Sequence, residues 1–166
     1  MATERTVEVE WVGDFLSGEG TIVSSTSGKL PALEVTWEGR NNYDEGGLSS
    51  PEELLAAAHA SCYSMQLAAG LVGGGWDPVE IKTASTVAME VGVGIISSKL
   101  VVHVEIDGEI PDDKLREVAE RAKVMCPVSR ALAGIEVVLE LPDLAPPEDE
   151  EPEGEEVAAA ADGADE

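Results

Sequence analysis

The run of residues 49–69 constrains the fold more than any other part of the chain. Ser50 can cap a helix, Pro51 suits the first helical position, where a missing N–H costs nothing, and Glu53 can reach back to the cap. After Glu53 the run is mostly Ala and Leu and contains no Asp, Glu, Lys or Arg. The sequence therefore predicts a long central helix that is apolar nearly all round and needs burial on most of its sides.

His59 and Cys62 stand in the middle of this helix, on one face, since residues three apart are neighbours on a helix surface. A cysteine there is either inert packing, the more common case for so buried a residue type, or the centre of the chemistry. His59 is predicted to be a satisfied buried histidine rather than a catalytic base, because nothing nearby in the sequence supplies an orienting carboxylate. His103, on a predicted strand, has no evident role.

Segments that alternate apolar and polar residues predict strands on both sides of this helix. The predicted strands are residues 7–11, 21–25 and 30–37 before the helix, and residues 80–91, 95–106 and 135–141 after it. The first three are expected to form an antiparallel meander, and Gly92 and Gly94 suit a hairpin turn between the next two. Thr83, Ser85 and Lys99 are expected to share one face of that hairpin.

Two further helices are predicted near the end of the domain. Residues 111–125 have helical spacing, with acidic residues early and basic residues late, as the helix dipole favours. Residues 126–134 predict a short helix with Cys126 at its cap and Pro127 first inside. Glycines at 70 and 73–75 are expected to end the central helix. This order of elements predicts an α+β domain, with antiparallel sheets around the long central helix.

Acidic residues outnumber basic residues by 34 to 10, which gives a formal net charge of -24. Ten of them lie from Ala145 onward, where there is no Lys or Arg. Residues 145–166 are therefore predicted to be an acidic disordered tail, because they have too few apolar side chains to offset the ordering entropy. Residues 1–144 have the length of one domain.

The charge and the hydropathy exclude several classes of partner. An acidic surface disfavours binding to nucleic acid, although it also fits a simple role in solubility at high salt. No apolar run approaches the roughly 18 residues of a membrane span. The first residues lack the basic start and apolar block of a signal peptide, so the expected location is the cytoplasm.

The two cysteines, 64 positions apart, exclude a CxxC motif and give no zinc quartet, so we expect no metal and no cofactor. Cys126 precedes Pro127 at a helix start, where free N–H groups favour a thiolate. Cys62 is too far along its helix for that help, and its ionisation requires a cation or donors from elsewhere. Arg40 and Arg130 are the candidate cations.

Two motifs together resemble the OsmC/Ohr family, the osmotically inducible and organic hydroperoxide resistance proteins. The first is Ala57-Ala-His-Ala-Ser-Cys62 within the central helix, and the second is Cys126-Pro-Val-Ser-Arg-Ala-Leu132. The lead-in Leu33-Glu-Val-Thr-Trp-Glu-Gly39 is more similar to the OsmC branch. The resemblance covers about residues 5–142 and excludes the tail.

The resemblance implies a thiol-dependent peroxidase of oxidative and osmotic stress defence. Cys62 would attack an organic hydroperoxide, or hydrogen peroxide, and become a sulfenic acid, which Cys126 would convert to a disulfide. A dithiol reductant, lipoyl-type in this family, would restore both thiols. Glu52 and an Arg complete the family's site; some members carry this Arg at the position of Thr36, whereas the nearest candidate here is Arg40.

The family's substrate is a small molecule with an organic part. Leu55, Tyr63 and Met65 are predicted to shape a pocket for it. The alternative is a non-catalytic relative that binds a small hydrophobic molecule, or a structural stress protein with two buried thiols. Stoichiometric consumption of an organic hydroperoxide by the thiols distinguishes the enzyme from both.

Helix geometry predicts that the site is shared by two chains. Glu52 and Cys62 are ten residues apart, roughly 15 Å along one helix, which is too far for a common pocket. Two central helices packed antiparallel about a two-fold axis near Ala57 would bring Glu52 of one chain to Cys62 of the other. The small side chains there would allow close approach. The predicted assembly is an intertwined homodimer.

Overall fold

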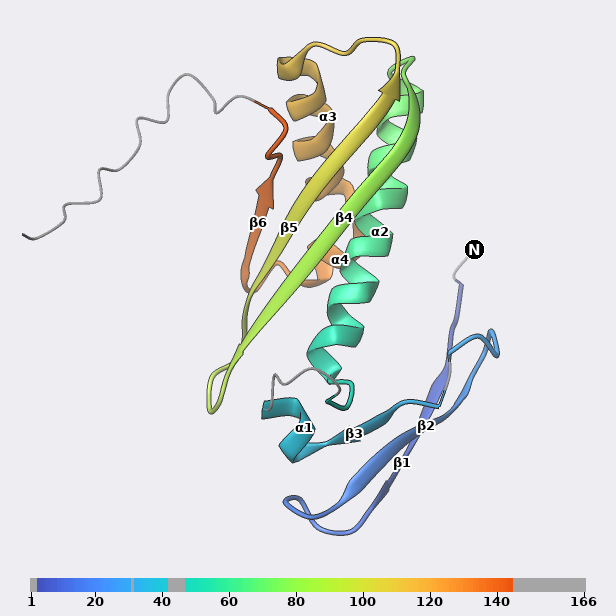
Figure 1. Cartoon of the computed structure of the whole chain (residues 1–166), viewed down its shortest axis with the longest axis vertical. Coiled ribbons are helices and arrows are strands. Elements are labelled where there is room, and N and C mark those ends of the chain that lie inside the picture. The colour runs from blue at the N-terminus through green and yellow to red at the C-terminus, as the bar shows by residue number, and fades with distance from the viewer. Residues whose placement is uncertain (1–2, 31, 42–46, 145–166) are drawn as a thin grey trace, which may run out of the picture.

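Two separate three-stranded sheets and a long helix organise the chain (Figure 1). The computed structural model describes residues 3–30, 32–41 and 47–144. Its elements are β1 (Val7–Val12), β2 (Glu19–Ser25), β3 (Glu34–Thr36), α1 (Trp37–Asn41), α2 (Pro51–Gly73), β4 (Asp77–Glu90), β5 (Gly94–Asp107), α3 (Asp112–Met125), α4 (Pro127–Ala131) and β6 (Glu136–Glu140). The predicted α+β class is confirmed. The predicted tail lies outside the described residues.

The second sheet, in the order β4-β5-β6, supports the helices. β4 and β5 form a long antiparallel hairpin whose turn contains Gly92 and Gly94, both at positive φ, as expected. β6 lies beside β5 but runs parallel to it, so this sheet is mixed rather than wholly antiparallel. α2 packs against β4, and α3 packs against α2 (Figure 1).

The core lies between this sheet and the helices. Its buried members are Tyr63, Leu67 and Leu71 of α2, Leu100 and Val102 of β5, Leu115, Ala119 and Ala122 of α3, and Cys126. The cross-strand register corrects one expectation, because Thr83 and Ser85 pair with core residues of β5 and therefore lie on the covered face. Lys99 lies on the opposite face, where its Nζ pairs with Glu140 at 2.6 Å.

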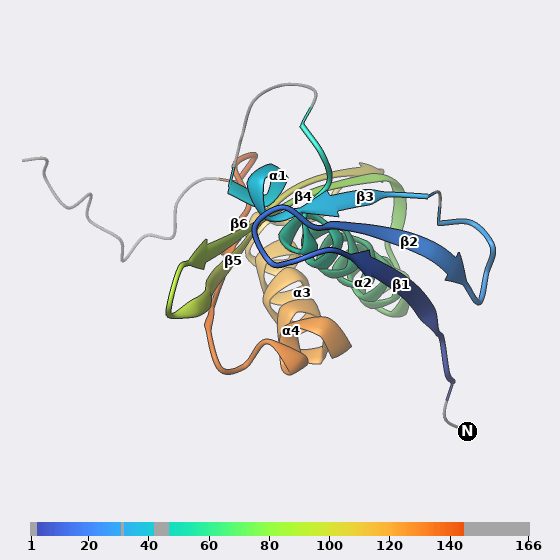
Figure 2. The same ribbon diagram turned by 90° about the horizontal axis from the view of Figure 1, so that it is seen from below.

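The first sheet, β1-β2-β3, is the predicted antiparallel meander, but its third strand is shorter than expected. The predicted strand 30–37 is reduced to Glu34–Thr36 because the chain turns into α1 at Trp37. The Thr36 hydroxyl accepts a hydrogen bond of 2.9 Å from the Gly39 N–H and so begins the helix. This sheet lies at the Pro51 end of α2, apart from β4–β6 (Figures 1 and 2).

The start of α2 is capped as the sequence predicts. The Glu53 N–H donates to Ser50 Oγ at 3.1 Å, and the Ser50 N–H donates to the Glu53 carboxylate at 3.1 Å. The helix continues through Gly70, where an added Cβ would come within 3.0 Å of Val118 of α3, and it ends at Gly73. Gly70 therefore serves the close approach of α3 to α2 rather than ending the helix.

The substitution Ser50→Ala is expected to lower the free energy of unfolding by about 1 kcal/mol, because it removes the side chain that caps α2. Denaturant titration followed by circular dichroism measures this loss. Ser49→Ala, one residue earlier, is the matched control and should leave the midpoint unchanged. Equal midpoints for the two variants would show that the capping box contributes nothing.

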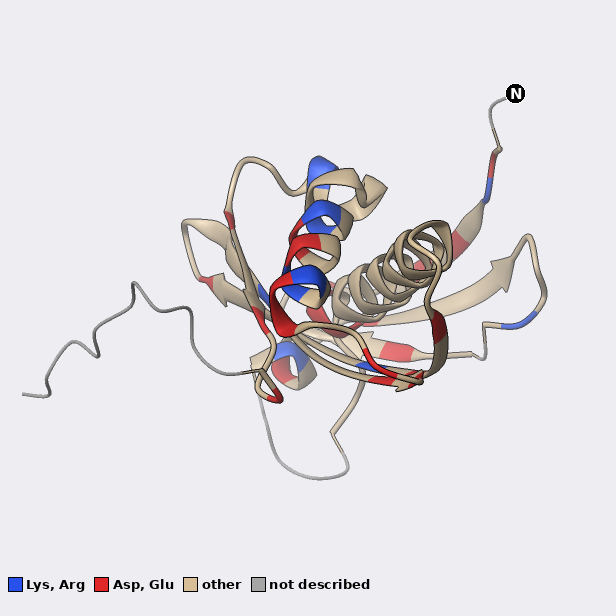
Figure 3. Cartoon of the chain, turned by 90° about the horizontal axis from the view of Figure 1, so that it is seen from above, with Lys and Arg blue, Asp and Glu red and all other residues tan. Residues whose placement is uncertain are grey.

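The chain by itself buries only one face of α2. His59, Tyr63, Leu67 and Leu71 are buried at four-residue spacing, whereas Ala57, Ser61 and Met65 are exposed. Met65 is 67% exposed. α2 carries no Asp, Glu, Lys or Arg after Glu53, in contrast to α3 (Figure 3). Despite this apolar character, none of the described helices is both long and apolar enough to cross a membrane.

Candidate functional site

The fold brings the two cysteines together. Cys62 projects from the middle of α2, and Cys126 is the single residue between α3 and α4. Both cysteines are free, and their thiols lie close enough for each to act on the pKa of the other. Cys126 is fully buried, whereas Cys62 is half-buried and retains access to solvent. A small molecule arriving from solvent would therefore meet the Cys62 sulfur first.

Groups in the first turn of α4 act on the pKa of both cysteines, although the Cys126 side chain makes no capping hydrogen bond there. Burial acts to raise the pKa of Cys126, but the N–H and hydroxyl of Ser129, the Cys62 thiol and the N–H of Val128 together lower it below the ordinary thiol value. Cys126 stands at the cap of α4 with Pro127 next, as the sequence predicts. In this chain Cys126 is therefore the cysteine whose thiolate is stabilised.

The pKa of Cys62 is shifted in the opposite direction. Burial raises its pKa, the Val128 N–H opposes that rise, and the hydrogen bond and charge of Cys126 add to it. Among the described residues, neither Arg40 nor Arg130 is a group that acts on the Cys62 pKa. Within one chain the Cys62 thiol therefore keeps its proton and lacks the cation that its activation requires.

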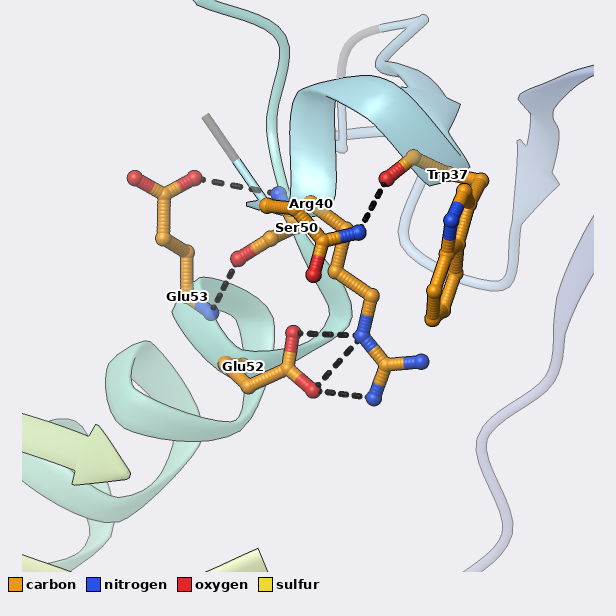
Figure 4. A network of polar contacts seen from close by, with 6 residues as sticks. Trp37, Arg40, Ser50, Glu52 and Glu53 are labelled. Carbon is orange, nitrogen blue, oxygen red and sulfur yellow. Dashed lines mark hydrogen bonds and ion pairs between the residues drawn. The ribbon is translucent and has the colours of Figure 1, made fainter. Parts of the chain in front are cut away.

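Arg40 and Glu52 form a second cluster (Figure 4). The Arg40 Nε lies 3.0 and 3.2 Å from the two Glu52 carboxylate oxygens, and Nη2 also donates to Oε1. The guanidinium also lies over the Trp37 ring, 5.9 Å from its centroid. The hydrogen bonds that Arg40 donates to Glu52 raise the Arg40 pKa above its ordinary value. The guanidinium is thus held in one orientation by a charge-assisted fork and an aromatic face.

The chain brings Arg40 to Glu52 and Cys62 to Cys126, but it does not bring the two clusters together. Glu52 is in the first turn of α2, and the helix between it and Cys62 is continuous. Ten residues of helix rise roughly 15 Å, so the ion pair and the dithiol occupy different levels of α2. The four predicted site residues thus form two half-sites in this chain.

The predicted pocket-lining residues do not gather around Cys62 in this chain. Tyr63 belongs to the core, and its hydroxyl donates to the Ala119 carbonyl at 3.2 Å. Met65 projects to solvent, and Leu55 is half-buried. The prediction was wrong for Tyr63, because adjacent residues of a helix face different directions and the Tyr63 direction is that of Leu67 and the core.

His59 is a satisfied buried histidine, as predicted, but its partners were not foreseen. Its Nδ1 lies 2.7 Å from Ser98 Oγ and its Nε2 lies 2.8 Å from Ser129 Oγ. Ser129 is also one of the groups that lower the Cys126 pKa. The one signal in the sequence was the placement of His59 and Cys62 on the same helix face. His103, by contrast, is exposed and pairs with Asp143 at 2.9 Å.

No group of three or more His, Cys, Asp or Glu side chains among the described residues is placed to hold a metal ion.

Comparison with known families matches residues 44–140 to the OsmC-like proteins. This match includes α2 with Cys62 and the α3–α4 junction with Cys126. The chain therefore belongs to the OsmC-like family, which confirms the resemblance seen in its two cysteine motifs.

Individual relatives agree with this assignment. Peroxiredoxin OsmC of Escherichia coli (strain K12) is 33% identical over 135 residues, covering 80% of this chain and 92% of that protein. The organic hydroperoxide resistance protein OhrB of Bacillus subtilis is 26% identical, with a TM-score of 0.57, over 82% of this chain and 97% of its own. An OsmC-like protein from Vibrio cholerae, 14% identical, shares the fold at a TM-score of 0.65 over 84% of this chain and 99% of its own.

Proposed function

We propose that this protein is a thiol-dependent peroxidase that reduces organic hydroperoxides, and also hydrogen peroxide, to alcohol or water in oxidative and osmotic stress defence. The observation that carries the proposal is the proximity of the free thiols of Cys62 and Cys126, each of which acts on the pKa of the other. The names of two relatives, a peroxiredoxin and an organic hydroperoxide resistance protein, support the same chemistry.

The difference in burial supports the division of roles between the two sulfurs. The Cys62 thiolate, which solvent can reach, attacks one peroxide oxygen; an S–O bond forms, the O–O bond breaks, and the alkoxide leaves and takes up a proton. The Cys126 thiolate then attacks the Cys62 sulfenic acid; the S–S bond forms, the S–O bond breaks, and hydroxide leaves as water. A dithiol of the lipoyl type reduces the disulfide and becomes oxidised itself.

In this proposal the working unit is a homodimer with two composite sites. The Cys62 thiol lacks a cation in its own chain, while Arg40 is held rigidly by Glu52 at the other level of α2. Antiparallel packing of two α2 helices through the exposed Ala57 face would place the partner's Arg40 and Glu52 beside Cys62. There the guanidinium would stabilise the Cys62 thiolate and the developing alkoxide.

Exposed apolar surface gives independent support for this dimer. β1 and the loop that follows it expose large apolar side chains in the single chain: Val7, Val9, Trp11, Val12, Phe15 and Leu16. The main contacts of β1–β3 are with one another and with α1. A sheet with this much uncovered apolar surface is expected to pack on a second copy of the chain, whose α2 also has an exposed apolar face.

Addition of an organic hydroperoxide to the reduced protein should consume one equivalent per chain and remove both free thiols. The expected product is a Cys62–Cys126 disulfide, because the two thiols are already close enough to act on each other's pKa. Thiol counting and peptide mapping by mass spectrometry measure both quantities, with tert-butyl hydroperoxide as the probe. Reduced lipoamide should then restore both thiols. Thiols that persist in excess hydroperoxide would contradict the proposal and favour a non-catalytic binding or structural role.

A further inference from the structure

A chain of buried polar side chains leads from the sheet to the Cys126 sulfur. His59 is fully buried, with Ser98 Oγ on its Nδ1 and Ser129 Oγ on its Nε2, at 2.7 and 2.8 Å. Ser98 is fully buried, Ser129 is 7% exposed, and the Ser129 hydroxyl is one of the groups that lower the Cys126 pKa. Burial of an imidazole costs free energy unless its nitrogens are paired, so an apolar side chain would serve packing alone at lower cost.

The tautomer of His59 and the position of the Ser129 hydroxyl hydrogen determine the direction of each hydrogen bond. Burial lowers the pKa of His59, so its imidazole is neutral and carries one N–H. Ser129 has a single hydroxyl hydrogen, which goes either to Cys126 or to His59. When it lies on Cys126, Ser129 Oγ accepts from His59, which places the imidazole hydrogen on Nε2. Nδ1 then accepts from the Ser98 hydroxyl, and every donor in the chain points toward the sulfur.

The other tautomer would have the opposite effect. With the hydrogen on Nδ1, His59 would donate to Ser98, and Nε2 would need the hydrogen of Ser129. The Cys126 sulfur would then lose a hydroxyl donor while remaining fully buried. The identity of the nitrogen that holds the hydrogen therefore determines whether Ser129 supports a negative charge on sulfur.

We propose that His59 is a positioning residue for Cys126: by donating from Nε2 to Ser129, it turns the Ser129 hydroxyl onto the Cys126 sulfur and keeps that sulfur ready to attack oxidised Cys62. The reaction named here rests on the proposed function, but the hydrogen-bonded chain does not. His59 touches neither substrate nor the reacting sulfurs and acts only through Ser129.

The other titratable groups around Cys126 do not take the positioning role that we propose for His59 and Ser129. Cys62 and Tyr63 face it from α2, and burial raises the pKa of both, so both stay neutral. From α3, the charge of Glu120 acts on Tyr63 and favours its neutral form further. On α4, Arg130 follows Ser129 directly, but the groups that lower the Cys126 pKa are the Ser129 and Val128 N–H groups, the Ser129 hydroxyl and the Cys62 thiol.

A thiolate titration in the Cys62→Ser background tests this proposal, because Cys126 is then the only cysteine. Followed by ultraviolet absorbance, His59→Leu should raise the Cys126 pKa by about one unit, since a hydrogen bond to a charged group is weakened. At a pH below both values the thiolate fraction should fall about tenfold. His59→Gln, whose amide can still donate to Ser129, should restore part of the shift.

Two further variants separate positioning from general damage. Ser129→Ala should raise the pKa at least as much as His59→Leu, and the double variant should add nothing, because both act through one hydroxyl. His103→Leu, which changes the exposed histidine, is the matched control and should cause no shift. A raised pKa in Ser129→Ala together with an unchanged pKa in His59→Leu would overturn the proposal.

Nitrogen NMR of the unmodified reduced chain tests the His59 tautomer directly and does not require any variant to fold. A neutral His59 with its hydrogen on Nε2 is expected; a hydrogen on Nδ1, or a charged imidazolium, would overturn the proposal. Neither measurement uses a peroxide. If the peroxidase assay fails while the titration and the NMR give the expected results, the proposed function is refuted and the role of His59 stands. If the assay succeeds while the titration or the NMR contradicts expectation, only the role of His59 is refuted.

Discussion

Cys62→Ser is expected to abolish dithiol-dependent peroxide reduction, with a loss on the order of 10³-fold or more, because it removes the nucleophile itself. The remaining Cys126 is fully buried and cannot meet a peroxide from solvent. The measurement is the steady-state loss of tert-butyl hydroperoxide with reduced lipoamide. Full activity in this variant would refute the assignment of Cys62 as the attacking cysteine.

Cys126→Ser is the matched control for that loss, because it changes the other sulfur by the same atom. It should still reduce one equivalent of hydroperoxide per chain and then stop at the Cys62 sulfenic acid or at a disulfide between two chains. A burst without turnover in Cys126→Ser, against no burst in Cys62→Ser, assigns the two roles. Identical behaviour of the two variants would contradict the assignment.

Mixed dimers are expected to regain activity that neither parent chain has. One chain carries Arg40→Gln and the other carries Cys62→Ser, and each homodimer should be almost inactive. In the mixed dimer, one composite site would combine an intact Cys62 with the partner's intact Arg40, and the other site would lack both. The purified mixed dimer should therefore show about half of the unmodified activity.

The same experiment distinguishes the shared site from an arrangement in which each chain contains a complete site of its own. Every site in the mixed dimer would then lack either the guanidinium or the thiol, and no activity would return. Dual affinity tags isolate the mixed dimer, and light scattering verifies its mass. A mixed dimer as inactive as its parents, or a stable and active monomer, would refute the shared site.

The features that local sequence patterns encode could be predicted well. The capping box of α2, the start of α4 at Cys126 and the hairpin glycines each depend on residues within a few positions of one another. Family resemblance indicated Arg40, Glu52, Cys62 and Cys126 as candidate site residues; in the structure Arg40 pairs with Glu52, and the two cysteines act on each other's pKa. The roles of these four residues remain predictions.

The features that depend on distant contacts were missed. The partners of His59 lie 39 and 70 positions away in the chain, so no local pattern could identify them. Polar Ser85 and Thr83 appeared to belong with Lys99, yet they face the helices, where Ser64 donates to Thr83 at 2.8 Å. α1 was missed because the Thr36 cap interrupts a sequence that otherwise alternates like a strand.

The position of Cys126 between two helices has a consequence for the speed of disulfide closure. Its backbone is extended, with φ of -61° and ψ of 121°, a conformation that a following proline favours on steric grounds alone. Covalent geometry and two helix ends thus hold the sulfur beside Cys62 before any oxidant arrives. If Cys62 is oxidised as proposed, we expect disulfide closure without a search by a mobile loop, so that the bond-making step, rather than a movement of the chain, limits its rate.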